Sequence, residues 1–344
     1  MRDSDLLVVS EEPFNAETRL DSLTSLTTPA GRHYVRTHFA IPDAPSEVLI
    51  EGSTSARVSR DEIAAMSSRT LTATLECAGN GRRFLHPPVP GEQWGLGAVG
   101  TARWTGVPLK RLLDRVGLPS GAREVFFRGA DEGTPKDLAR RIAYERSLPL
   151  AAALRDDVLV AFAMEGSAIP PEHGGPLRLI VPGWYGMASV KWLSRITLLD
   201  RPFAGFFQKD RYVIDGEPLA EIAPRALITH PVDGADVAGP VVEVQGFAWS
   251  GTAPIVKVEV AVHPPGQRGE PRWREAALAD LEEPYAWRRF DKRLLAVDAR
   301  GPVAVELVAR ASDGAGNIQP LDPVWNALGY RNNAARTVRI RMIP

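Results

Sequence analysis

A cluster of prolines and glycines divides this chain of 344 residues into two parts of unequal length. Pro202, Gly205, Gly216, Pro218 and Pro224 lie close together, and breakers at this density favour an exposed connection between domains. At about 150 residues per domain, a chain of this length is expected to form two domains. We therefore predict a first domain over residues 1–215 and a second over residues 216–344.

The hydrophobic pattern changes across this boundary. Beyond residue 225, apolar residues recur in strand-like segments separated by Gly, Pro and Asp turns, namely Val241–Trp249, Ile255–Val262, Pro302–Ala311 and Thr337–Ile343. Several short strands at this spacing are typical of an immunoglobulin-like β-sandwich.

The first part mixes short strands with short helices. Leu71–Leu75, Glu124–Phe127 and Leu177–Val181 are strand-like, whereas Pro108–Val116 carries apolar residues at i, i+3, i+4 and i+7, which predicts a helix packed on a sheet. Residues 1–45 are expected to be mostly extended and irregular. The predicted fold class is therefore α+β, with a mixed α/β domain followed by an immunoglobulin-like β-sandwich.

Composition excludes several classes of function. The chain has 41 basic and 42 acidic residues, so no global field would attract nucleic acid or an anionic membrane surface. No apolar run approaches the roughly 18 residues that a membrane-spanning helix needs. Because the N-terminus lacks the basic start and apolar stretch of a signal peptide, we predict a cytoplasmic protein, or a periplasmic one if a leader has been removed.

The chain contains one cysteine, Cys77. A single cysteine excludes an intrachain disulfide, a zinc finger and a cysteine-ligated iron–sulfur cluster, and no C-x-x-C-H run is present for a c-type haem. A predicted strand ends at Cys77, and glycines and the pair Arg82 and Arg83 follow. Neighbouring positive charge would lower the pKa of the thiol and favour the thiolate, which attacks substrates or binds soft metals.

Three interpretations of Cys77 stay open on these grounds. Free cysteines are often inert and buried. A nucleophilic thiolate would need a histidine base, and His38, His86 and His173 are candidates without a diagnostic spacing. A metal-binding thiolate would need its other ligands from a cofactor, because one cysteine with scattered histidines forms no zinc or copper pattern.

A second group of unusual residues runs from Pro171 to Trp192. Glycine-rich loops flank a short apolar strand and end at Lys191, an arrangement able to hold a phosphate and a flat polar ring. Each residue also has a simpler interpretation, with His173 capping a turn, Arg178 in an ion pair and Trp192 in the core.

Taken together, five segments resemble the sulfite oxidase family of molybdenum enzymes, in family order and over nearly the whole chain. They are Tyr34–His38, Leu75–Arg83, Gly100–Val107, Glu172–Arg178 and Val190–Leu193. The resemblance implies that Cys77 is the protein ligand of a molybdenum–molybdopterin cofactor. It further implies a set of residues that bind this cofactor: Tyr34, Arg36, Thr37, His38, Asp131, His173, Arg178, Ser189 and Lys191.

The resemblance also implies a cationic substrate pocket beside the metal. Its residues would be Arg36, one of Arg82 and Arg83, Trp94 and Tyr212. Two departures stand out. Thr37 occupies a position where animal and plant members usually have Asn. Leu328 lies where a family stretch carries an arginine, and Arg331 is the alternative cation in that stretch.

By the same resemblance, the expected activity is oxidation of sulfite to sulfate by a homodimer that associates through its second domain. No haem domain fits before residue 34, so electrons would pass to an external acceptor such as a cytochrome. Alternative functions are reduction of nitrate or S-oxides, oxidation of another sulfur compound, or a non-enzymatic module that kept the fold.

Overall fold

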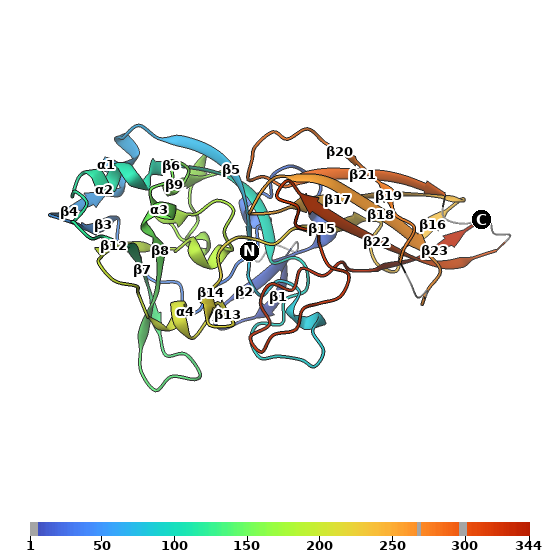
Figure 1. Cartoon of the computed structure of the whole chain (residues 1–344), viewed down its shortest axis with the longest axis horizontal. Coiled ribbons are helices and arrows are strands. Elements are labelled where there is room, and N and C mark those ends of the chain that lie inside the picture. Colours follow the sequence, from blue (N-terminus) through green and yellow to red (C-terminus); the bar gives the residue numbers. More distant parts are fainter. Residues whose placement is uncertain (1–5, 267–269, 296–300) are drawn as a thin grey trace.

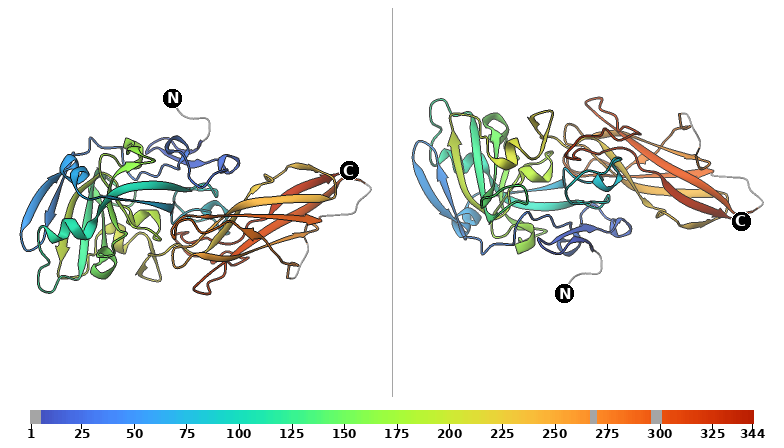
Figure 2. Two further views of the ribbon diagram at one scale, coloured as in Figure 1. Left: turned by 90° about the horizontal axis from the view of Figure 1, so that it is seen from above. Right: turned by 90° about the horizontal axis from the view of Figure 1, so that it is seen from below.

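The computed structural model describes residues 6–266, 270–295 and 301–344. The chain forms two lobes along its longest axis, with the N-terminal two thirds at one end and the C-terminal strands at the other (Figures 1 and 2). The fold class predicted from the sequence is confirmed, because an α+β lobe precedes a lobe built of strands.

Within the part of the chain that the structure describes, the first lobe contains two five-stranded sheets and four short α-helices. One sheet has the order β10-β9-β6-β5, with β11 paired to β9, and the other has the order β4-β3-β12-β7-β8. The strands of these sheets are β3 (Glu47–Glu51), β4 (Ser55–Ser59), β5 (Arg69–Glu76), β6 (Val99–Pro108), β7 (Glu124–Gly133), β8 (Ile142–Pro149), β9 (Leu159–Met164), β10 (Ser167–Ala168), β11 (Arg178–Ile180) and β12 (Leu193–Leu199). The helices are α1 (Arg60–Ala65), α2 (Leu109–Asp114), α3 (Leu150–Ala153) and α4 (Phe206–Lys209).

The predicted helix at 108–116 is present as α2. Leu109, Leu112 and Leu113 are fully buried and Val116 is 1% exposed, so the apolar face packs into the core as expected. The N-terminal segment is less irregular than predicted, because β1 (Leu6–Ser10) and β2 (Asn15–Thr18) form an antiparallel hairpin. All four residues of β2 are buried.

The second lobe is a β-sandwich. Its four-stranded sheet has the order β15-β17-β21-β20 and its five-stranded sheet the order β16-β23-β22-β18-β19. The strands are β15 (Arg225–His230), β16 (Asp236–Ala238), β17 (Val241–Trp249), β18 (Ile255–His263), β19 (Arg274–Glu275), β20 (Ala277–Leu278), β21 (Arg288–Leu295), β22 (Val303–Asp313) and β23 (Val338–Ile343). A small hairpin of β13 (Val213–Ile214) and β14 (Glu217–Pro218) precedes it. All four strands predicted here are present, whereas β15 and β21 were not singled out.

Strand β5 ends directly before Cys77, and its two faces have different surroundings. Alternate side chains of a strand point to opposite faces, and Leu71, Ala73 and Leu75 belong to the same apolar cluster as Cys77. Thr74 and Glu76 point to the other face, where Trp249 of the second lobe donates a hydrogen bond to Glu76 at 2.9 Å. The alternation of β5 therefore determines which side Cys77 faces.

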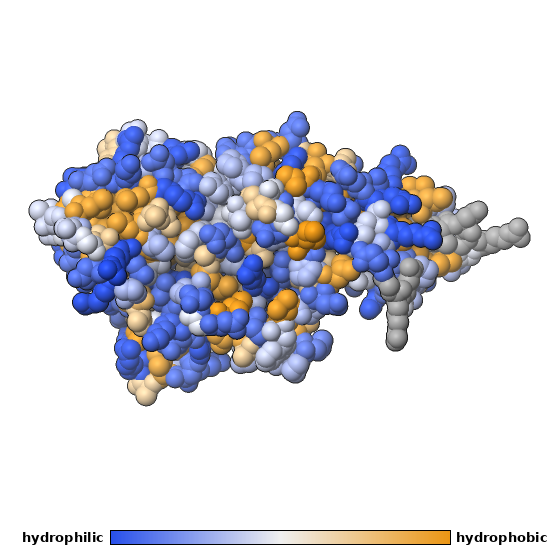
Figure 3. All heavy atoms as spheres, viewed as in Figure 1, coloured by the Kyte–Doolittle hydropathy of each residue, from blue (hydrophilic) through white to orange (hydrophobic). Residues whose placement is uncertain are grey.

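Among the described residues, no helix is long and apolar enough to span a membrane. On the face shown in Figure 3, apolar side chains form separate patches within a mostly polar surface.

Candidate active site

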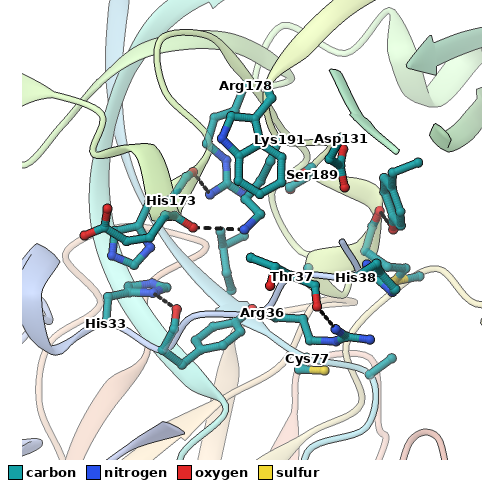
Figure 4. A pocket seen from close by; sticks show the side chains of 18 of the residues that line it. His33, Arg36, Thr37, His38, Cys77, Asp131, His173, Arg178, Ser189 and Lys191 are labelled. Atoms are coloured by element: carbon teal, nitrogen blue, oxygen red, sulfur yellow. Dashed lines mark hydrogen bonds between the residues drawn. The ribbon is translucent and has the colours of Figure 1, made fainter. Parts of the chain in front are cut away.

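Two adjoining cavities lie at the C-terminal end of β5, and Arg36, His38, Cys77 and Tyr212 line both. The inner cavity gathers every residue for which the resemblance implied cofactor binding (Figure 4). The outer cavity adds Arg82 and Trp94. The structure thus brings together residues from distant parts of the sequence, with Arg83 as the exception.

Cys77 follows the last residue of β5 and is 8% exposed. Burial raises the pKa of its thiol, and the positive charges of Arg36 and Arg82 oppose that shift without overcoming it. The pKa lowering expected from the neighbouring arginines was therefore wrong, because desolvation outweighs their charge. A soft metal that binds this sulfur would displace the proton.

Residues of the segment 34–38 line the inner cavity, and Asn15 of β2 holds this segment in place. Asn15 Oδ1 accepts hydrogen bonds from the Thr37 backbone N–H at 2.7 Å and from Arg36 Nη1 at 3.2 Å. Arg36 Nη1 also donates to the Thr37 carbonyl. Among the described residues, no carboxylate pairs with Arg36, and its Nε and Nη2 groups have no protein acceptor. Its guanidinium is thus available to an anion beside Cys77.

His38 and Tyr212 form a polar contact where the cavities meet. His38 Nε2 lies 2.6 Å from the Tyr212 hydroxyl, and the His38 ring stacks on Tyr144 at 4.8 Å. Burial and the positive charge of Arg36 lower the pKa of His38, so its imidazole is neutral. Tyr212 has a φ of 56°, a left-handed conformation that is uncommon for a bulky residue and that the surrounding packing stabilises.

The far end of the inner cavity collects positive charge. Arg178 is 5% exposed and donates to the carbonyls of His173 at 2.7 Å and Ser189 at 3.0 Å, and Lys191 donates to the Glu172 carbonyl at 2.9 Å. Burial and the charge of Arg178 lower the pKa of Lys191. No ion pair to a carboxylate neutralises either cation within the described residues.

Asp131 lies in the same region at an irregularity in the pairing of β7 with β8, between Arg128 and Glu132. Such a bulge redirects side chains, here into the cavity. Asp131 is 3% exposed, its Oδ1 has no hydrogen-bond partner in the described structure, and burial raises the pKa of its carboxyl. An unpartnered buried oxygen of this kind calls for a donor from a bound group.

Of the two candidate arginines, Arg82 lines the outer cavity and Arg83 is exposed and lines neither cavity. Arg82 donates from Nε and Nη2 to the Leu328 carbonyl at 3.3 and 3.1 Å, and from Nη1 to the Glu92 carbonyl at 2.9 Å. Trp94 is fully buried and its indole N–H has no partner among the described residues. Arg82 therefore holds the wall of the cavity together, and Arg83 is not brought to the site.

The C-terminal stretch supplies the other wall. Leu328 and Tyr330 line the outer cavity, and the Tyr330 ring stacks on Tyr212 at 5.1 Å. Arg331 is exposed and lines neither cavity, although its backbone N–H donates to the Ala78 carbonyl at 2.8 Å. The side chain of Arg331 thus does not supply a cation at the position of Leu328.

Several lining residues were not predicted from the sequence. His33 is buried in the inner cavity, and its Nε2 has no partner in the described structure. Burial lowers the pKa of His33 to about 4. Tyr144 and Met187 also line the cavity. His33 precedes the recognised segment 34–38 directly, which was an available signal, whereas nothing in the local sequence marked Tyr144.

Comparison with known proteins gives two domain matches. Residues 38–207 match an oxidoreductase molybdopterin binding domain, and residues 218–343 match a Mo-co oxidoreductase dimerisation domain. Chicken sulfite oxidase is 32% identical over 96% of this chain and 76% of its own length. The chain belongs to the sulfite oxidase family of molybdopterin-dependent oxidoreductases.

Other sulfite oxidase relatives agree with this assignment. Rat mitochondrial sulfite oxidase is 31% identical over 100% of this chain, which spans about two thirds (67%) of that relative. The crystal structure of the sulfane dehydrogenase SoxCD from Paracoccus pantotrophus matches with a TM-score of 0.80 and 25% identity, over 96% of this chain and 85% of that one. The family resemblance, the fold class and the enzyme class predicted from the sequence are confirmed.

The residues present fit the cofactor of the family. Cys77 offers one buried sulfur, and Arg178 and Lys191 offer positive charge that a phosphate would neutralise. The unpartnered atoms Asp131 Oδ1 and His33 Nε2 can pair with the donors and acceptors of a pterin. Glycine is required at position 186 of the cavity wall, because a Cβ there would clash with the Tyr34 hydroxyl at 2.7 Å.

Proposed function

We propose that this protein oxidises sulfite to sulfate at a molybdenum–molybdopterin cofactor and passes the electrons to an external acceptor. The observation that supports this most is the position of Cys77 and Arg36, which share the junction of the two cavities. A metal-binding sulfur and a guanidinium with free donors meet there.

In this proposal the inner cavity holds the cofactor. Cys77 would bind the metal, Arg178 and Lys191 would bind the phosphate, and Asp131 and His173 would hydrogen-bond the pterin, with Tyr34, Thr37, His38 and Ser189 completing the lining. The chemistry that the cofactor supplies is acceptance of two electrons and transfer of an oxygen atom.

The outer cavity would bind and orient sulfite. Free N–H groups of Arg36 would form charge-assisted hydrogen bonds with the oxyanion and hold its sulfur toward Cys77. Tyr212 would donate its hydroxyl proton in a further hydrogen bond in the tautomer of neutral His38 whose Nε2–H donates to the Tyr212 oxygen. The buried aromatic wall of Trp94 and Tyr330 would exclude water.

The test is sulfite-dependent reduction of ferricyanide by protein made in a host that produces molybdopterin. Cys77→Ser should lower turnover at least 100-fold with an unchanged circular dichroism spectrum, because a hydroxyl is a poor ligand for a soft metal. Arg36→Gln should lower kcat/KM for sulfite about 100-fold, whereas Arg83→Gln, outside both cavities, should change it little. Full turnover by the Cys77→Ser enzyme would contradict the assignment of the metal ligand.

A second candidate is oxidation of another sulfur compound. The structural match to the sulfane dehydrogenase SoxCD favours it, because that protein is named for a sulfur substrate other than sulfite. Reduction of nitrate is less well supported, since birch nitrate reductase is 30% identical and this chain covers 40% of its length.

We also propose that the protein is a homodimer, that it is cytoplasmic, that the chain given by this sequence binds no haem, and that its electron acceptor is a separate protein such as a cytochrome. The match of residues 218–343 to a dimerisation domain supports the first of these.

A further inference from the structure

The outer cavity is larger and more apolar than sulfite alone requires. Its free volume is about 350 Å³, within the range of pockets that hold organic ligands. Cys77, Arg36 and Tyr212 form its polar end, where it adjoins the inner cavity. The rest of the lining includes a set of rings and aliphatic side chains: Phe39, Pro90, Pro135, Phe206, Leu328 and Tyr330.

Several cationic side chains line this cavity, but most of them are not free to bind an anion. Arg82 directs three of its five N–H groups to the carbonyls of Leu328 and Glu92. Arg211 forms an ion pair with Asp137, and Lys136 is exposed. Arg36 is therefore the guanidinium that keeps donors free beside Cys77, at Nε and Nη2 within the described structure.

A guanidinium with two free donors next to an apolar wall suits an anion that has two oxygens and an apolar substituent. Nε and Nη2 of an arginine match two oxygens of one head group, as in an arginine–carboxylate pair. The wall formed by Phe206, Leu328 and Tyr330 suits an apolar substituent, and aromatic rings there favour stacked or edge-to-face contacts.

We propose that the site accepts organic sulfinates, R–SO₂⁻ with an apolar R group, in addition to sulfite. This inference rests on the proposed function. The reaction is R–SO₂⁻ + H₂O → R–SO₃⁻ + 2H⁺ + 2e⁻, in which a new S–O bond forms and the R–S bond stays intact. A one-electron acceptor such as ferricyanide takes the two electrons in two steps, and the protons pass to solvent.

The experiment compares three substrates with molybdenum-loaded protein and ferricyanide: sulfite, methanesulfinate and benzenesulfinate. Benzenesulfinate should be converted to benzenesulfonate, identified by mass spectrometry, with kcat/KM about tenfold higher than that of methanesulfinate. Calorimetric titration with the two sulfonate products gives a readout independent of turnover, and benzenesulfonate should bind about tenfold more tightly than methanesulfonate.

Leu328→Arg tests the wall directly. The half-buried Leu328 lines the cavity, whereas Val324 in the same stretch is 71% exposed and does not, so Val324→Arg is a matched control. The Leu328 substitution should lower kcat/KM for benzenesulfinate about tenfold relative to kcat/KM for sulfite in the same variant. The Val324 substitution should change neither value.

The outcomes separate this inference from the proposed function. Protein that oxidises sulfite but not benzenesulfinate, or that binds both sulfonates equally, overturns the inference and leaves sulfite oxidation standing. Loaded protein that oxidises neither compound overturns both.

Discussion

Arg36 is the residue on which the proposed substrate chemistry depends most. Its side chain is held by Asn15 and the Thr37 carbonyl through a single nitrogen, Nη1, which leaves the rest of the guanidinium for an anion. Arg82 is also a candidate for the substrate pocket by the family resemblance, but it donates hydrogen bonds to backbone carbonyls. Two arginines that the resemblance assigned to one pocket thus differ in their contacts, because Arg36 keeps donors free and Arg82 holds the cavity wall.

Tyr212→Phe tests the hydroxyl at the junction of the cavities. The substitution removes the partner of His38 but keeps the ring that stacks on Tyr330. We expect kcat/KM for sulfite to fall about 100-fold, the usual effect of losing a donor to a reacting oxyanion. Tyr285→Phe is the control, because the Tyr285 hydroxyl pairs with Asp157 outside both cavities. Equal losses of activity in the two variants would contradict a role for the Tyr212 hydroxyl.

His33 should contribute a pH dependence to stability. Burial lowers its pKa from 6.5 to about 4, so below pH 6.5 the unfolded chain binds a proton that the folded protein does not. The free energy of unfolding therefore falls as pH falls. His33→Gln removes this contribution. Between pH 7 and pH 5, cofactor-free wild type should lose about 2 kcal/mol more stability than the variant in urea denaturation. Parallel pH profiles would contradict a neutral buried His33.

At the scale of elements, β5 and β15 are joined by a buried ion pair directly beside Cys77, the proposed metal ligand. Arg225 of β15 lies 3.0 Å from Glu76, the last residue of β5, and the two side chains are 4% and 1% exposed. Asn80 donates to the same carboxylate at 2.9 Å. The C-terminal stretch adds a hydrogen bond from Asn332 to the Gly81 carbonyl at 2.8 Å. The second lobe therefore holds the loop that carries Cys77.

Arg225→Gln should destabilise the protein by about 3–5 kcal/mol, because it leaves Glu76 buried without its cation. It should also speed labelling of Cys77 by a thiol reagent in the cofactor-free protein, since the loop loses an anchor. Adding Glu76→Gln should recover part of both effects. Arg195→Gln is the matched control, since its pair with Glu51 is exposed and should contribute about 1 kcal/mol or less. Unchanged labelling in the Arg225 variant would contradict the anchoring role.

At the scale of the whole molecule, the apolar core of the first lobe extends into the second lobe, which also has an apolar cluster of its own. Trp249 and Trp287 of the second lobe belong to the same buried cluster as the helix α2 leucines of the first. The candidate active site therefore has lining residues from both parts of the chain, since Leu328 and Tyr330 line the same cavity as Arg36 and Cys77. The boundary predicted at residue 215 stays a prediction.

A measurement of the mass in solution tests the proposed homodimer. Light scattering after gel filtration should give about twice the chain mass of 37.4 kDa. Val256 and Leu295 of the second lobe are 57% and 70% exposed, and large apolar side chains at this exposure are suited to a partner surface. A mass equal to one chain at micromolar concentration would contradict the proposal.

The sequence by itself determined the features that depend on local pattern and on recognisable motifs. The period of the α2 leucines, the alternation in β17, β18, β22 and β23, and the residues around Cys77 were readable because neighbouring residues carry those signals. Several residues that line the inner cavity, among them Cys77, His173 and Lys191, belong to the five segments that carried the family resemblance.

Only the tertiary structure decided which of these residues lie together and how their pKa values are shifted. The pKa of Cys77 depends on how deeply it is buried, and the roles of Arg82, Arg83 and Arg331 depend on which way each chain segment turns. Tyr144 reaches the inner cavity, and Arg225 reaches Glu76, through contacts between elements far apart in sequence. Desolvation and long-range packing are properties of the folded chain, and no local spacing encodes them.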